Sequence, residues 1–155
     1  MSEVIAIANQ KGGVGKTMTS VSLSACLALN NKKVLLLDLD PQGHSTKAFG
    51  FYDSTQYPLS MKDVIVSVIE DIPLDREQLI LHSNENVDIV PSNISLAGIN
   101  SKLESAMCRE TVLKRFIDNL EDRVSCILGG GTSEVGLEST IIDCTVDPAC
   151  ILRPG

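Results

Sequence analysis

The sequence lacks tryptophan, and aromatic residues make up only 3% of its 155 residues. Since hydrophobic residues still account for 43% of the chain, we expect a core built from aliphatic side chains. No apolar run approaches the roughly 20 residues that span a bilayer. The N-terminus enters an apolar run directly, without the basic segment and cleavage site of a secretory signal, so we expect neither a membrane anchor nor export.

Cysteine pairs and excess positive charge are also missing. The five cysteines form no C-x-x-C pair, so we expect reduced thiols in a cytoplasmic protein and no zinc site. Lysine and arginine number 13 against 20 acidic residues, which gives a net charge of −7. The excess of basic residues typical of a nucleic-acid-binding domain is therefore absent. The length of the chain fits one domain with its own core.

A glycine-rich loop stands between a strand-like run and a helix-like run. Val4–Ala8 precedes NQKGGVGKT at residues 9–17, and Met18–Leu29 follows it. This context is typical of phosphate binding, because glycines let backbone N–H groups turn toward an anion and the helix N-terminus adds its positive dipole end. We predict that Lys16 reaches the β- and γ-phosphates and that the Thr17 hydroxyl binds Mg²⁺. The alternative is a glycine turn that binds nothing.

The start of this loop departs from the general P-loop pattern. Gln10 stands where that pattern has glycine, and a second lysine, Lys11, opens the loop. This form resembles the deviant Walker A motif of the ParA/MinD family of ATPases. The resemblance implies ATP or ADP with Mg²⁺ as ligands, and a homodimer in which Lys11 reaches the partner's nucleotide. Met18 replaces a threonine usual in that family, which implies modestly weaker binding. The candidate nucleotide-binding residues are Gly12, Gly13, Val14, Gly15, Lys16, Thr17 and Met18.

Two carboxylates end a second buried strand, expected over Lys33–Asp40. Alternation along a strand puts the side chains of Asp38 and Asp40 on one face, at the sheet edge where ligands bind. One can help to hold Mg²⁺ while the other orients the attacking water. The resemblance to ParA proteins ties the second aspartate to hydrolysis, so Asp40 joins Lys11 and Lys16 as a catalytic candidate. Asp38 is predicted either to hold Mg²⁺ with Thr17 or to serve the structure.

Strand-like and helix-like segments alternate along the chain. They predict an α/β fold, a P-loop NTPase-like arrangement in three layers with a parallel sheet flanked by helices. Short strands are expected at Leu79–Leu81 and Val87–Val90, and helices at Leu96–Ser105 and Glu110–Leu120. A further helix is expected to begin at Ser60, which can act as its N-cap.

The resemblance to ParA proteins ends near Arg123. That family continues with a strand that carries the Walker B aspartate, whereas Val124–Leu128 is followed here by three glycines, Gly129–Gly131. Residues 129–155, which include VGLESTIIDC and ILRPG, resemble a segment of the YrdC-like threonylcarbamoyl-AMP synthases. The fold is therefore expected to be a truncated ParA fold that a foreign C-terminal segment completes.

We interpret the chain as a ParA-like nucleotide-binding region, 1–123, and a C-terminal segment, 124–155, packed on the same domain. The sheet position beside the first strand is open to two candidates, Val124–Leu128 and Thr140–Ile142. In the second case Asp143 would approach the Mg²⁺ site, and otherwise it is a surface or turn carboxylate.

The function predicted first is that of a ParA-like ATP-binding protein of the chromosome and plasmid partitioning family, with weak or lost hydrolysis. The alternative is a chimeric or recombined protein with a stable fold and no selected activity. Threonylcarbamoyl-AMP synthase activity ranks third, because the N-terminal lysine–arginine motifs of that family do not occur. The DNA binding expected of ParA proteins is not predicted for this acidic chain, and the oligomeric state is open.

Overall fold

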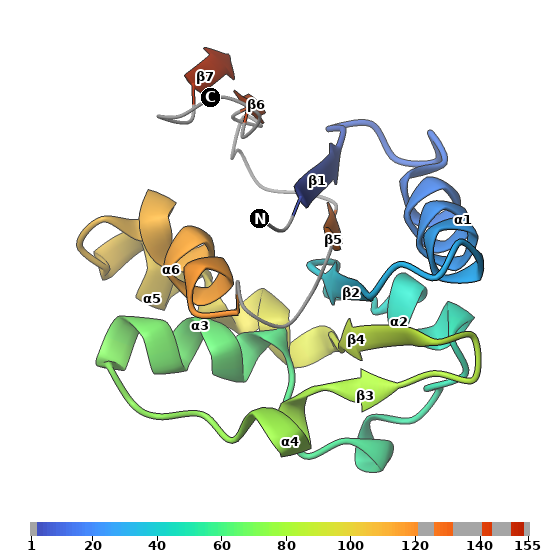
Figure 1. The fold of residues 1–155 in the computed structure, drawn as a ribbon. Coiled ribbons are helices and arrows are strands. Elements are labelled where there is room, and N and C mark those ends of the chain that lie inside the picture. Colours follow the sequence, from blue (N-terminus) through green and yellow to red (C-terminus); the bar gives the residue numbers. More distant parts are fainter. Residues whose placement is uncertain (1–2, 121–125, 132–140, 144–149, 154–155) are drawn as a thin grey trace.

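The computed structural model describes residues 3–120, 126–131, 141–143 and 150–153. Two sheets are present in these ranges (Figure 1). No helix in the described part of the chain is long and apolar enough to cross a bilayer.

The larger sheet has five strands in the order β1-β5-β2-β4-β3. The pairs β1–β5, β5–β2 and β2–β4 are parallel, and β3 pairs antiparallel with β4. The α/β prediction is therefore confirmed, with the correction that an antiparallel edge strand makes the sheet mixed. The strands are β1 (Glu3–Ala8), β2 (Val34–Asp38), β3 (Leu81–His82), β4 (Val87–Val90) and β5 (Cys126–Gly131).

Helices cover both faces of this sheet (Figure 1). α1 and α2 lie on one side, and α3, α5 and α6 lie on the other. The α-helices are α1 (Lys16–Leu29), α2 (His44–Ala48), α3 (Met61–Glu70), α4 (Arg76–Leu79), α5 (Asn100–Ser105) and α6 (Val112–Asp118). Three short 3₁₀ turns complete the set: η1 (Ser54–Gln56), η2 (Ile94–Ile99) and η3 (Arg109–Thr111).

Strand β2 divides the core in two. All five of its residues are buried, as expected of a central parallel strand. Its side chains alternate, so that Leu35 and Leu37 pack with α3 and α6, while Val34 and Leu36 pack with α1. The two clusters are aliphatic apart from Phe49 and Phe116, in keeping with the scarcity of aromatic residues.

Local chemistry explains where several elements begin. The Ser60 N–H and hydroxyl both donate to Asp63 Oδ2, at 2.9 and 3.0 Å, so the predicted cap of α3 is confirmed. The strand predicted at Leu79–Leu81 is wrong except for its last residue, since only Leu81 lies in β3. Asp75 accepts a hydrogen bond from Glu77 N and starts the short helix α4, which ends at Leu79. Hydrogen bonding within this turn outweighs the β propensity of the apolar residues.

The two helices predicted after β4 are each divided. The span expected at Leu96–Ser105 is the 3₁₀ turn η2 followed by α5, and the span at Glu110–Leu120 begins with η3 and continues as α6. Asn93 accepts a hydrogen bond from Ser95 N and so fixes the start of η2. Residues with strong local hydrogen-bonding side chains thus set the boundaries.

β5 lies between β1 and β2 in the larger sheet. Of the two candidates for this position, the earlier segment is confirmed, although Val124 and Ser125 lie outside the described residues. The later candidate is wrong, because Ile141–Asp143 forms β6, which pairs antiparallel with β7 (Cys150–Arg153) in a separate sheet. The proposed approach of Asp143 to the Mg²⁺ site depended on that placement and loses its basis. Thr140 and most of residues 129–155 lie outside the described ranges.

The glycines of β5 continue the strand. In the parallel register Gly130 lies opposite Ile7 of β1 and Asp38 of β2. The strand Cys126–Gly131 contains no aspartate, and its last three residues are glycines that bring no side chain to this end of the sheet.

Candidate functional site

The glycine loop connects β1 to α1 at the carboxyl end of the sheet. Gly13 and Gly15 have φ of +71° and +89°, a left-handed conformation that glycine adopts without strain. A Cβ added to either one, or to Gly12, would meet nothing within 4 Å. The backbone of the loop therefore borders open space, as a phosphate-binding loop requires.

The N-terminus of α1 carries no cap of its own. Gly15 is the N-cap residue, no side chain bonds to the first turn, and that turn contains no acidic residue. The first backbone N–H groups of a helix lack intrahelical partners and carry a partial positive charge. With 14 residues, α1 is long enough to develop this field. The loop and the helix together provide donors without a built-in anion.

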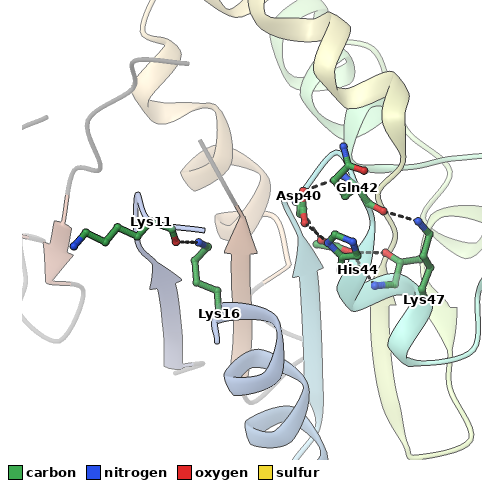
Figure 2. A network of polar contacts seen from close by, with 8 residues as sticks. Lys11, Lys16, Asp40, Gln42, His44 and Lys47 are labelled. Carbon is green, nitrogen blue, oxygen red and sulfur yellow. Dashed lines mark hydrogen bonds and ion pairs between the residues drawn. The ribbon is translucent and has the colours of Figure 1, made fainter. Parts of the chain in front are cut away.

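The two lysines of the loop lie differently. Lys16 Nζ donates to the carbonyl oxygen of Lys11 at 2.8 Å, which folds its side chain back over the loop (Figure 2). The side chain of Lys11 extends away from Lys16 in the same view, while its backbone N–H donates to Asn9 Oδ1 at 2.9 Å. Lys16 is thus held at the loop, whereas the ammonium of Lys11 points outward, the orientation that a role toward a partner needs.

The remaining loop candidates are partly accessible. Thr17 is half-buried in the first turn of α1, next to Lys16. Met18 is 70% exposed, and its thioether is not a donor for phosphate. Val14 is exposed as well, so only its backbone N–H has a use toward a phosphate.

Asp38 is a buried carboxylate with hydrogen bonds to both oxygens. Its Oδ2 accepts from the N–H and the hydroxyl of Thr46, at 2.8 and 2.6 Å, and its Oδ1 accepts from Asp40 N at 3.1 Å. Burial raises the pKa of the Asp38 carboxyl, and the hydrogen bonds from Thr46 and Asp40 oppose that rise. This geometry favours the structural interpretation of Asp38, and its role toward Mg²⁺ stays a prediction.

Asp40 lies two residues beyond the end of β2, in the turn that leads to α2. Its Oδ1 accepts from Gln42 N at 2.9 Å, and its Oδ2 lies 3.0 Å from His44 Nδ1. Its side chain is 9% exposed, whereas that of His44 is 57% exposed. Because β2 ends at Asp38, the strand alternation used to place both aspartates does not extend to Asp40.

The predicted residues fall into two groups (Figure 2). Lys11 and Lys16 lie at the end of β1, and Asp40 lies at the end of β2, with β5 between the two strands. Both groups share the carboxyl edge of the parallel strands, where ligands bind in such sheets. In the described ranges no three His, Cys, Asp or Glu side chains are grouped to hold a metal.

A buried polar network joins the Asp40 turn to the end of β4. Thr46 Oγ1 accepts from Ser92 N at 3.0 Å, and the Tyr57 hydroxyl donates to Ser92 O at 3.1 Å. Thr46 and Ser92 are each 1% exposed. The sequence prediction missed these residues, because no spacing links positions 46 residues apart. The only available signal was the strand–turn pattern that places Asp40 and Ser92 after parallel strands.

The hydroxyl of Ser92 takes no part in this hydrogen-bond network. Its Oγ is buried and has no hydrogen-bond partner among the described residues. Burying an unsatisfied hydroxyl costs about 1–3 kcal/mol.

Ser92→Ala should therefore leave the free energy of unfolding in urea unchanged or raise it by up to about 1 kcal/mol. Ser60→Ala, which removes a satisfied helix cap, should lower it by about 1 kcal/mol. A clear loss in the Ser92 variant would show that its hydroxyl has a partner.

The comparisons with known proteins identify the family of the chain. A family model described as an AAA domain matches residues 2–136. The chain belongs to this AAA domain family. The match extends beyond residue 123 and includes β5, so the AAA domain takes in the strand between β1 and β2 whose origin was in question.

The relatives of this AAA domain include two Soj proteins. The chain is 38% identical over 137 residues to the sporulation initiation inhibitor protein Soj of Bacillus subtilis, covering 88% of this chain and 52% of the relative. It is 35% identical over 130 residues to the chromosome-partitioning ATPase Soj of Treponema pallidum, covering 83% and 47%. These matches confirm a ParA-type P-loop ATPase segment, but they support no YrdC-like fragment.

A solved structure also matches the chain in fold and in sequence. The cobyrinic acid a,c-diamide synthase of Mycobacterium smegmatis, with a bound ATP analogue and magnesium, superposes with a TM-score of 0.77 at 34% identity. The match covers 86% of this chain and 52% of that one. This AAA domain thus spans about half the length of the relatives that it matches.

Proposed function

We propose that this chain binds ATP or ADP together with Mg²⁺ at the glycine loop. The observation that carries the proposal is the open loop of Gly12, Gly13 and Gly15 in front of an uncapped α1, with Lys16 held beside it. The matched synthase structure, with its ATP analogue and magnesium, supports the choice of ligand. The β- and γ-phosphates would replace the Lys11 carbonyl as the partner of Lys16.

Each predicted residue has a role in this proposal. Thr17 would give its hydroxyl to Mg²⁺, which commonly completes its shell with phosphate oxygens and water. Asp40 would orient the attacking water, and Lys11 would reach the nucleotide of a second copy in a homodimer. Asp38 would act on the Mg²⁺ region through the Asp40 turn, since its oxygens already accept hydrogen bonds from Thr46 and Asp40.

We propose that hydrolysis is weak. In β5, Gly130 lies opposite Asp38 and offers no carboxylate to hold the water shell of Mg²⁺. Removing such a group reduces the stabilisation of charge in the transition state more than it reduces ground-state binding. Nucleotide binding and turnover are therefore expected to be separable in this chain.

The broader role proposed is that of a partitioning ATPase of the ParA type in the cytoplasm. The Soj relatives support this role, but the chain matches only about half of their length. Dimerisation and DNA binding therefore remain proposals, and the net charge of −7 argues against DNA binding by this part alone.

Titration calorimetry with ATP, ADP and AMP tests the binding proposal. AMP lacks the phosphates that Lys16 and the loop would hold, so its affinity should be at least about 100-fold lower than that of ATP. Chelation of Mg²⁺ should weaken ATP binding, because the Thr17 hydroxyl would hold the metal beside the phosphates. Equal affinities for ATP and AMP, or no heat with any nucleotide, would contradict the assignment.

A protein of recombined origin with no selected activity is the second candidate. The observation that favours it is the separate β6–β7 sheet, which does not extend the main sheet. Cooperative unfolding together with an absence of nucleotide binding would support this alternative.

A further inference from the structure

The buried hydroxyl of Thr46, a residue of α2, helps to fix the turn that holds Asp40. Thr46 is the third residue of α2, and its Oγ1 lies between two elements that are far apart in sequence. It donates to Asp38 Oδ2 at 2.6 Å and accepts from Ser92 N at 3.0 Å. The ends of β2 and β4 are therefore joined through this one side chain.

Asp38 transmits this constraint to Asp40. The carboxylate that accepts from Thr46 also accepts from Asp40 N through its other oxygen. The Asp40 side chain then accepts from Gln42 N, and its carbonyl accepts from Gly43 N at 2.8 Å. A chain of hydrogen bonds thus runs from Ser92 N through Thr46 and Asp38 to the backbone N–H of Asp40, and it fixes the backbone that carries the Asp40 carboxylate.

The packing around this chain leaves little room for adjustment. Asp38, Thr46 and Ser92 are at most 1% exposed. The Cα of Gly43 is so close to β4 that a Cβ there would lie 2.6 Å from Ser92 O. Water is therefore a poor substitute for the Thr46 hydroxyl. Loss of this group would leave the Ser92 N–H without its acceptor and would remove one of the two donors to Asp38 Oδ2.

We propose that Thr46 is a positioning residue for Asp40, and that its hydroxyl sets the orientation of this carboxylate for water activation. The inference rests on the proposed function only for the use of Asp40 in hydrolysis. The positioning of Asp40 by Thr46 is already present in the nucleotide-free protein, where it can be measured directly.

The variants Thr46→Val and Thr46→Ser separate the hydroxyl from the shape of the side chain. Valine keeps the volume and removes both hydrogen bonds, whereas serine keeps them. Amide hydrogen exchange of nucleotide-free protein should be about tenfold or more faster at Asp40 and Gln42 in Thr46→Val, and unchanged at Leu36 in β2. Thr46→Ser should restore wild-type exchange at both sites. Ser92→Ala, which keeps the Ser92 N–H, is the matched control and should match wild type.

Single-turnover hydrolysis and ATP titration supply the second readout. Thr46→Val should slow hydrolysis about tenfold while the dissociation constant for ATP stays within about twofold, because the loop at β1 is not part of the network. Exchange at Asp40 and Gln42 that is unchanged in Thr46→Val, or not restored by Thr46→Ser, would overturn the proposal. Failure of wild type to bind ATP would defeat the proposed function instead, while the exchange result would still decide whether Thr46 positions Asp40.

Discussion

Replacing Lys16 with alanine should lower the affinity for ATP by about 100-fold or more. The ammonium would make charge-assisted hydrogen bonds to phosphate oxygens, each worth about 1.5–3 kcal/mol. In the nucleotide-free protein this group is bonded only to an exposed carbonyl, that of Lys11, among the contacts described. The free energy of unfolding should therefore change by less than about 0.5 kcal/mol. Calorimetric titration of ATP into folded Lys16→Ala measures the effect.

Lys11→Ala is the matched control, since it removes the same charge from the same loop. The Lys11 side chain extends away from Lys16 (Figure 2), so its loss should leave the ATP affinity of a single chain within a few-fold of wild type. Its effect should appear instead in nucleotide-dependent self-association. Equal losses of affinity in the two variants would mean that the loop acts through general charge rather than through a directed contact.

Gly43→Ala should destabilise the fold by about 3 kcal/mol. Two costs act at this position. The φ of +62° is unfavourable for alanine, and the new methyl group would lie 2.6 Å from the carbonyl oxygen of Ser92. That oxygen belongs to the backbone, which also accepts from Tyr57, so it has little freedom to move. Urea denaturation followed by circular dichroism measures the loss.

The variant Gly50→Ala separates the cost of backbone strain from the cost of the steric contact. Gly50 has φ of +93°, but a Cβ there would meet nothing within 4 Å. This variant should therefore show only the backbone strain, about 1–2 kcal/mol. If Gly43→Ala were no more damaging than Gly50→Ala, the close approach of the Asp40 turn to β4 would not matter for stability.

The sequence was sufficient for the parts of the fold that local patterns encode. The apolar run of β2 predicted a buried parallel strand, and the Ser60–Asp63 pair predicted the start of α3. The apolar run of β1 predicted a strand covered on both faces, but β1 is an edge strand of the sheet and none of its residues is buried, so that part of the prediction is wrong. The position of β5 was left between two candidates. Periodicity cannot decide which strand is inserted between two others, because that choice depends on long-range pairing.

The candidate site also has one part that the sequence predicted and one part that it did not. The glycine loop is contiguous, so its residues and their conformation followed from one motif and its flanking elements. The network around Asp38 is not contiguous, because it brings Thr46 and Ser92 together from neighbouring strand ends. Thr46 and Ser92 are polar residues buried by tertiary packing, and no periodic signal in the sequence marks them. The structural role of Asp38 could be stated only as one of two interpretations.

The shortness of β3 has a consequence for the behaviour of the protein at high concentration. This edge strand has two residues and contains an exposed histidine, His82, which is bonded to Asp88. An edge of this kind offers too few backbone groups for another sheet to add to it, and its polar side chains disfavour the attempt. The β3 end of the sheet is thus protected from strand-by-strand aggregation.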